Sequence, residues 1–150
     1  MLRVPGEEQE PVDPAVLVKG CGAAIIAVDN SGAITAWNPA AERLYGYSSN
    51  VMLGQSILML SPRNRPADLA ESLDAARAGA TLMSREAVHI RQNGRLVEVF
   101  LSVSPVFKTG TVAGAVLVAQ DMTERRREED ERLELITELT RALSKMGAAP

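Results

Sequence analysis

The sequence predicts an α+β fold in which an antiparallel sheet carries short helices on one face and the chain ends in a long amphipathic helix. Three observations support this prediction. An early apolar run is followed by turn residues and a second short segment, the residues after these repeat with helical spacing, and after Gly79 apolar residues alternate with a period of two around further turn residues. Strands joined by tight turns pair in the antiparallel direction, so one sheet with helices on one side follows.

The amino-terminal segment has no periodic pattern of apolar residues that would indicate a helix or strand packed in the core. Residues 1–12 combine prolines with acidic residues, and we expect a disordered tail. Asp13 can cap a short lead-in helix that has Pro14 in its first turn, and Gly20 and Gly22 end this helix.

A hairpin and a short helix follow. The apolar run 23–29 and the segment 33–37 predict two strands joined by the turn residues 30–32, which read Asn-Ser-Gly. Asn38 can cap the next helix, and Gly46 ends it.

Three further helical segments precede the second block of strands. A short helix is expected from near Ser48 to Gly54, and residues 57–60 form an apolar turn. Residues 66–78 have the apolar spacing of a longer helix, which Gly79 ends.

The second block contains three strands. Residues 87–91 and 96–106 alternate around Gln-Asn-Gly at 92–94, which predicts a hairpin with a type I′ turn. Thr-Gly at 109–110 separates this hairpin from a third strand over 112–119. The last two strands are apolar on both faces, so we expect the lead-in helix or a dimer partner to cover the outer face.

Composition excludes several classes of protein. The chain has 150 residues, 16 Lys and Arg, 19 Asp and Glu, one cysteine and one histidine. These residues provide neither a zinc site nor a basic, aromatic surface for direct nucleic-acid binding. The chain has no phosphate-binding loop and no apolar run of 18 residues, and its first residues do not resemble a signal peptide. We therefore expect a cytoplasmic protein that does not contact membranes, has no catalytic residues and is not an enzyme.

Three segments together resemble a known family. They read VDNSGAITAWNPAAERLYGYSSNVMLGQS (28–56), RQNGRLVEVFLSVSPV (91–106) and GAVLVAQDMTER (114–125). The chain resembles a PAS domain, the small sensor fold of bacterial signalling proteins, from about Val16 to Arg127. This resemblance implies a five-stranded antiparallel sheet of order 2-1-5-4-3, with short helices around a cavity. It divides the chain into a tail (1–12), a PAS domain (13–122) and a signalling helix (123–146).

The expected cavity is lined by apolar side chains, with polar tips from an indole and a phenol. Because a filled core uses the same residue types, many of these residues can equally be plain core. The candidates are Ile25, Trp37, Leu44, Tyr47, Ile57, Leu60, Leu73, Ile90, Val99, Leu101, Val116 and Val118.

The DMTER segment resembles the family's junction between the last strand and a signalling helix. We expect a relay junction at Asp121, Met122, Thr123 and Arg125, in which Thr123 caps the helix and strand movement changes the helix phase. The alternative is a plain helix cap. Arginines 125–127 and the acids that follow form i,i+4 pairs, such as Arg126 with Asp130, which indicates a solvated helix face.

The long helix carries an apolar seam with heptad-like spacing at Ile136, Leu139, Leu143 and Met146. The seam needs a partner, and we expect a parallel homodimer, with packing of the helix on its own domain as the alternative.

Flavin and haem are both disfavoured as cofactors. Ala119 stands where the resemblance implies a flavin-contacting glutamine, Gln120 should face the other way, and Cys21 is far from the position of the reactive cysteine. Helix 66–78 lacks an axial histidine, and we expect His89 to point away from the face that Val88 and Ile90 cover. A closed core or a small apolar ligand is the expectation.

The resemblance implies a sensory module that dimerises and relays a conformational signal to a kinase, a response regulator, a transcription regulator or another output. Two alternatives remain open. The chain can be a ligand-independent interaction scaffold, or the amino-terminal sensor fragment of a histidine kinase in a two-component system.

Overall fold

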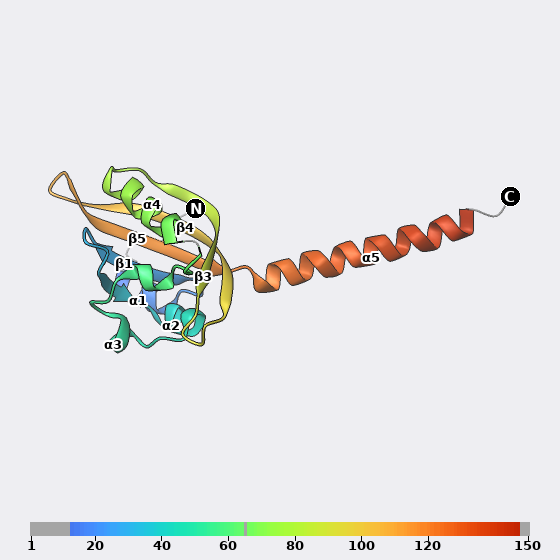
Figure 1. The fold of residues 1–150 in the computed structure, drawn as a ribbon, viewed down its shortest axis with the longest axis horizontal. Coiled ribbons are helices and arrows are strands. Elements are labelled where there is room, and N and C mark those ends of the chain that lie inside the picture. The colour runs from blue at the N-terminus through green and yellow to red at the C-terminus, as the bar shows by residue number, and fades with distance from the viewer. Residues whose placement is uncertain (1–12, 65, 148–150) are drawn as a thin grey trace, which may run out of the picture.

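The computed structural model describes residues 13–64 and 66–147, which form one twisted sheet, a group of short helices and a projecting terminal helix (Figure 1). The predicted tail over 1–12 lies outside the described residues. The elements are α1 (Pro14–Gly20), β1 (Ala24–Asp29), β2 (Ile34–Trp37), α2 (Pro39–Tyr45), α3 (Ser49–Met52), the 3₁₀ helix η1 (Ile57–Leu60), α4 (Pro66–Arg77), β3 (Leu82–Ile90), β4 (Leu96–Lys108), β5 (Thr111–Asp121) and α5 (Thr123–Gly147).

The five strands form a single antiparallel sheet of order β2-β1-β5-β4-β3, as expected. The two blocks of strands meet where β1 pairs with β5 in the middle of the sheet, for example at Ile26 opposite Leu117. Segments from the two ends of the folded domain therefore share the centre of the sheet, and β5 leads directly into α5.

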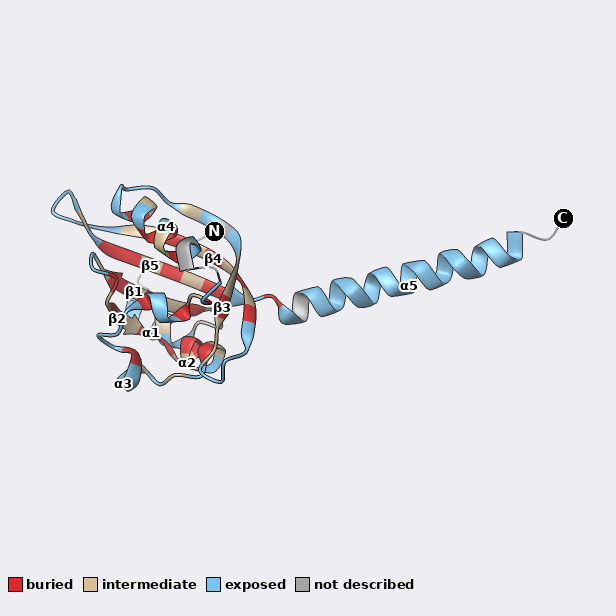
Figure 2. Cartoon of the chain, in the orientation of Figure 1, coloured by how far each residue is buried: buried red, intermediate tan, exposed pale blue. Residues whose placement is uncertain are grey.

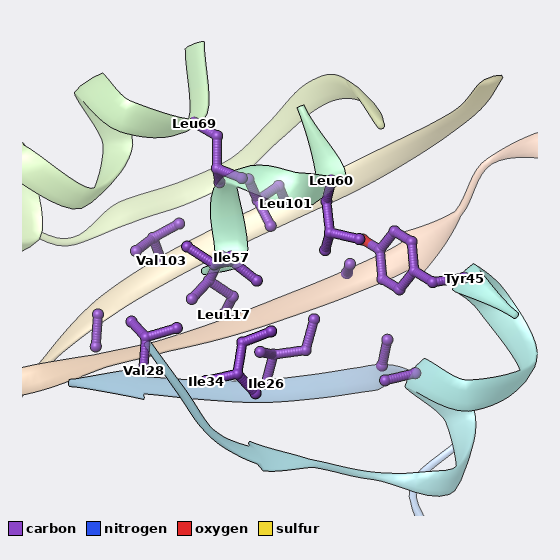
Figure 3. Close-up of a cluster of buried hydrophobic side chains, with 14 of the residues drawn as sticks. Ile26, Val28, Ile34, Tyr45, Ile57, Leu60, Leu69, Leu101, Val103 and Leu117 are labelled. Carbon is purple, nitrogen blue, oxygen red and sulfur yellow. The ribbon is translucent and has the colours of Figure 1, made fainter. Parts of the chain in front are cut away.

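The core lies between one face of the sheet and the helices α2, α3, η1 and α4. Figure 2 shows the buried positions as stripes along the strands, and Figure 3 shows the side chains that meet between the two layers. The strands contribute alternate residues to this core, so each strand has one inward face. The largest fully buried side chains are Tyr45, Ile26, Ile34, Met52, Ile57, Leu60, Leu117, Val99 and Val103.

Asn38 joins the first helix, the first hairpin and α2 through a fully paired side chain. Its Oδ1 accepts hydrogen bonds from Ile25 N and Ala41 N, both at 2.9 Å, and its Nδ2 donates to Val18 O at 2.9 Å and Ala23 O at 3.0 Å. Asn38 is only 3% exposed, and a buried amide with all four bonds made is stable in a core. The predicted cap of α2 by Asn38 is confirmed. The amide nitrogen of the same side chain also holds α1 through its bond to Val18 O.

The prediction of a type I′ turn at residues 92–94 is wrong. In that loop only Gly94 has a positive φ, whereas a type I′ turn needs positive φ at two successive central residues. The type I′ geometry occurs instead at Thr109 and Gly110, with φ of 52° and 83°, between β4 and β5. Arg91 N donates to Arg95 O at 2.8 Å, and this bond closes the loop after β3. Three residues, 92–94, lie between the bonded pair, so the turn is wider than a two-residue type I′ turn.

The outer face of the sheet is not buried under α1. None of the residues of α1 is buried, and Val16 and Leu17 are about 60% exposed (61% and 59%). The outer-face side chains Ile25, Val116 and Val118 are half-buried. The expectation that a dimer partner covers this face stays a prediction.

Gly114 lies where β5 passes very close to β1, in register with Asp29. A Cβ at residue 114 would collide with the carbonyl oxygen of Val28, and the backbone of a central strand cannot move away easily.

We therefore predict that Gly114→Ala lowers the free energy of unfolding by about 1–3 kcal/mol or more, since overpacking a rigid site is costly. Urea unfolding followed by circular dichroism measures this change. Gly22→Ala is the matched control, because a Cβ there meets nothing within 4 Å. Equal unfolding midpoints for the two variants would contradict the prediction.

Candidate functional site

The predicted cavity residues divide between the two faces of the sheet. Those that belong to the core are buried, and two more, Leu44 and Tyr47, are half-buried against it. Trp37 donates from Nε1 to the carbonyl oxygen of Tyr47 at 3.0 Å, so the indole tip is used within the fold. The buried members of the set are Trp37, Ile57, Leu60, Leu73, Val99 and Leu101.

Four of the predicted residues do not line the core. Ile25, Ile90, Val116 and Val118 alternate with the buried residues of their strands and lie on the opposite face, half-buried. The sequence pattern could not separate the two faces, because both are apolar in these strands.

His89 lies on the opposite face of β3 from Val88 and Ile90, as expected, but that face is the inward one, so His89 and not these two residues is in the core. It is 2% exposed, and its Nδ1 lies 2.7 Å from the hydroxyl oxygen of Tyr45, which is itself fully buried. Alternation in β3 shows which residues share a face, but not which face is inward, and here Val88 and Ile90 face outward. A polar pair can occupy the inner face because the two groups satisfy each other.

Burial sets the protonation of this pair. Burial lowers the pKa of the His89 imidazole from 6.5 to about 4, so the ring is neutral at pH 7. Burial, and the negative charge of Asp121, raise the pKa of the Tyr45 phenol above its ordinary value. The phenol therefore keeps its proton and can donate it to Nδ1 of the neutral ring.

The junction between β5 and α5 is fixed by the carboxylate of Asp121. Its Oδ1 accepts from Thr123 N at 2.8 Å and its Oδ2 lies 3.2 Å from Nη2 of Arg91. The Asp121 carboxylate, rather than the Thr123 side chain as predicted, satisfies the first free amide of the helix, because α5 begins at Thr123 itself. Met122 is 4% exposed, and its N donates to Glu98 O at 2.9 Å, which ties the junction to β4.

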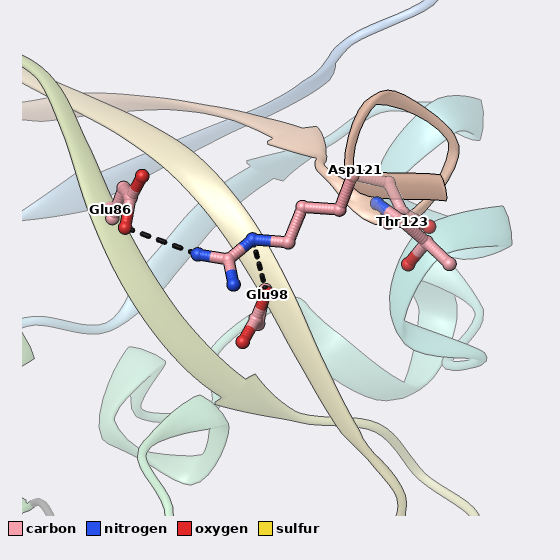
Figure 4. Close-up of polar contacts among 5 residues, drawn as sticks. Glu86, Glu98, Asp121 and Thr123 are labelled. Atoms are coloured by element: carbon pink, nitrogen blue, oxygen red, sulfur yellow. Dashed lines mark hydrogen bonds and ion pairs between the residues drawn. The ribbon is translucent and has the colours of Figure 1, made fainter. Parts of the chain in front are cut away.

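Arg126 adds a contact that the sequence did not predict. Its Nε lies 2.8 Å from Glu98 Oε2 and its Nη2 lies 3.3 Å from Glu86 Oε2, so the first turns of α5 are paired with β4 and β3 (Figure 4). The expected helical pairing of Arg126 with Asp130 is replaced by contacts to residues 28 and 40 positions away. Arg125, which was predicted for the junction, lies in the same helix, and its side chain is outside the described part.

Beyond the first turns, α5 projects away from the domain as a single rod (Figure 1). The whole predicted seam is exposed, from 51% at Ile136 to 79% at Met146, and Leu133 and Leu135 add 61% and 57%. These side chains form an exposed apolar stripe along α5.

The space beside His89 is too small for a large cofactor. A cavity of about 20 Å³ beside His89 lies in the core, whereas pockets for cofactor-sized ligands measure roughly 300–1,000 Å³. Ala119 is buried and Gln120 is exposed, so the glutamine faces away from the core as expected. Within residues 13–64 and 66–147, no cluster of three metal-ligating side chains forms, and none of the helices could cross a membrane.

The lowered pKa of His89 predicts how stability depends on pH. As pH falls from 6.5 to 4, the unfolded chain takes up a proton at His89 that the folded chain does not, so the free energy of unfolding decreases. The decrease is at most about 1.4 kcal/mol for each pH unit in this window. Chemical unfolding at several pH values measures it, with His89→Gln as the comparison that removes this term. Identical pH slopes for the two proteins would contradict it.

The comparisons with known proteins agree with this architecture. The PAS domain pattern matches residues 21–124. The signal transduction histidine-protein kinase AtoS of Escherichia coli (strain K12) is 28% identical over 130 residues, which cover 83% of this chain and 21% of AtoS. The oxygen sensor protein DosP of the same organism is 30% identical over 111 residues, which cover 71% of this chain and 14% of DosP.

Among solved structures, the PAS domain of a protein from Colwellia psychrerythraea superposes with a TM-score of 0.68 at 23% identity, covering 73% of this chain and 94% of that one. The chain spans about a fifth or less of the length of the curated relatives it matches. The strand order, the helices on one face of the sheet and the match over residues 21–124 lead to one conclusion: the chain belongs to the PAS domain family.

Proposed function

We propose that this PAS sensory module forms a parallel homodimer through α5 and relays a conformational signal from its sheet along that helix. The observation that carries the proposal is the combination of a tightly held junction with an exposed seam. Asp121 and Arg126 fix the start of α5 on β3, β4 and the end of β5, while the rest of the helix carries an unpaired apolar stripe.

The direction of the seam favours a second copy over packing of α5 on its own domain. The face of α5 that borders its own sheet carries Thr123, Arg126, Arg127, Asp130, Glu131 and Glu134, which line a depression of about 710 Å³. With 3.6 residues per turn, the centre of that face and the centre of the seam lie roughly 170° apart around the helix. The helix therefore presents its polar side to its own domain and its apolar side to solvent.

The composition of the seam supports a two-stranded assembly. Ile136 and Leu143 take the a positions of a heptad, and Leu139 and Met146 take the d positions. A β-branched residue at a and leucine at d favour two parallel strands. Two heptads are short, and the outer face of the sheet, with Ile25, Val116 and Val118, offers additional area for the same dimer.

The relay proposal rests on the small number of polar contacts that connect the sheet to the start of α5. A shift of β3 or β4 moves Glu86 or Glu98, and through Arg126 it changes the direction or phase of α5. A ligand can drive this change only if it binds the two states with different affinity. The output would be a kinase, a response regulator or a transcription regulator, and the relatives AtoS and DosP are a kinase and an oxygen sensor by name.

The related proposals concern location, catalysis and ligands. We propose a cytoplasmic module without catalytic residues, without haem or flavin, and without direct contacts to nucleic acid or membranes. A ligand-independent interaction scaffold is the alternative, and the small core cavity favours it over a sensor for a large ligand.

Single-cysteine crosslinking tests the dimer. With Cys21 changed to Ser, we expect Leu143→Cys to form an intersubunit disulfide, because d and a positions of parallel helices face their counterparts. Glu134→Cys is the control on the opposite side of α5, because nine residues place it about 180° around the helix from Leu143, and it should not crosslink. A strictly monomeric native mass at high protein concentration, with no product from Leu143→Cys, would end the dimer proposal.

Arg126→Gln tests the clamp. We expect little change in stability, since exposed ion pairs contribute about 0–1 kcal/mol, but a broader distribution of α5 orientations. Spin labels at Glu71 and Glu138, in protein diluted with unlabelled chains, report the intramolecular distance. Arg127→Gln removes a neighbouring charge on α5 and should leave the distribution narrow. An unchanged distribution in Arg126→Gln would show that Asp121 alone holds the helix.

A further inference from the structure

A small cavity of about 20 Å³ lies between the end of η1, α4 and β3, on the helix side of the sheet. It is distinct from the surface depression along α5. Its walls combine apolar side chains with hydroxyl and imidazole groups, among them Ser61, Leu69, Ser72, His89 and Leu101.

The hydrogen bonds around the cavity leave one hydroxyl unpaired. Ser72 Oγ donates to Asp68 O at 3.0 Å, so this group is satisfied within α4. Ser61 Oγ is inaccessible to solvent and has no hydrogen-bond partner among the described residues. Buried polar groups in folded proteins almost always have a partner, which can be an ordered water.

His89 lines the same cavity. Nδ1 is engaged by Tyr45 at 2.7 Å, and the buried phenol keeps its single proton for that bond. The neutral ring then carries its own proton on Nε2, which makes Nε2–H a hydrogen-bond donor. The cavity thus contains a donor on β3 and an unpaired hydroxyl after η1.

The volume decides which molecule fits. One water molecule needs roughly 10–15 Å³ of such space and two to four polar partners. We propose that this cavity is a binding site for a single water molecule, which accepts a hydrogen bond from His89 Nε2–H and bonds to Ser61 Oγ.

This site would complete a polar chain across the core, from Tyr45 on α2 through His89 on β3 to Ser61 after η1. The molecule bound in this cavity would then be water and not an apolar ligand. The site is also close to the relay, because Asp68, Glu86, Ala87 and Val88 line both this cavity and the adjacent depression of about 290 Å³ that reaches Arg126. The inference does not depend on dimerisation or on the relay.

The wild-type protein provides the first test. Nitrogen-15 NMR of the ring of the chain's one histidine should show the proton on Nε2, with a nuclear Overhauser effect from this proton to a bound water. A high-resolution crystal structure should show one density peak within hydrogen-bond distance of Nε2 and Ser61 Oγ. A proton on Nδ1 instead, or no such peak in the crystal, would overturn the proposal.

Two serine variants separate the site from a general effect on packing. Ser61→Ala should remove the water signal at the His89 ring, because the water loses one of its two partners. Ser72 lines the same cavity, but its hydroxyl is already bonded within α4, so the signal should persist in Ser72→Ala. A signal that survives in Ser61→Ala, or that is lost equally in both variants, would also overturn the assignment of Ser61.

Discussion

The passage of the chain from the central strand β5 into α5 depends on one carboxylate. Asp121 accepts from the first amide of the helix at 2.8 Å and pairs with Arg91 from the loop after β3, so the strand end and the helix start cannot move separately. A carboxylate at a helix amino terminus is favoured by both the free N–H groups and the helix dipole. This joint and the Arg126 pairs together hold the start of α5 on the sheet.

The clamp at Arg126 and the joint at Asp121 differ in what they contribute. The Asp121 contacts include backbone groups that any helix start must satisfy, so they belong to the fold. The Arg126 pairs are exposed at the side chains, 47% for the arginine and 63% and 45% for the glutamates, and such pairs add little stability. Their effect is geometric, because a guanidinium that bridges two strands allows fewer helix orientations. A weak but specific contact suits the relay that we propose.

Asn38 and the Tyr45–His89 pair enter the core as hydrogen-bonded sets. Asn38 makes four side-chain hydrogen bonds at 3% exposure, and Tyr45 and His89 pair at 2.7 Å. Each set links elements that are distant in sequence, as when His89 on β3 meets Tyr45 on α2, 44 residues earlier. In a low-dielectric interior such bonds are costly to leave unmade, so they select one arrangement of the helices over the sheet.

The sequence alone determined the elements, the PAS resemblance, the caps at Asp13 and Asn38 and the spacing of the seam, because these depend on neighbours within a few residues. Only the tertiary structure decided which face of β3 is inward, which placed His89 in the core and Ile90 outside it. Periodicity reports that alternate residues share a face and is silent about which layer that face meets. The pairing of Arg126 was equally beyond local reasoning, because both glutamates come from other strands and helical i,i+4 neighbours offered an equally good local partner.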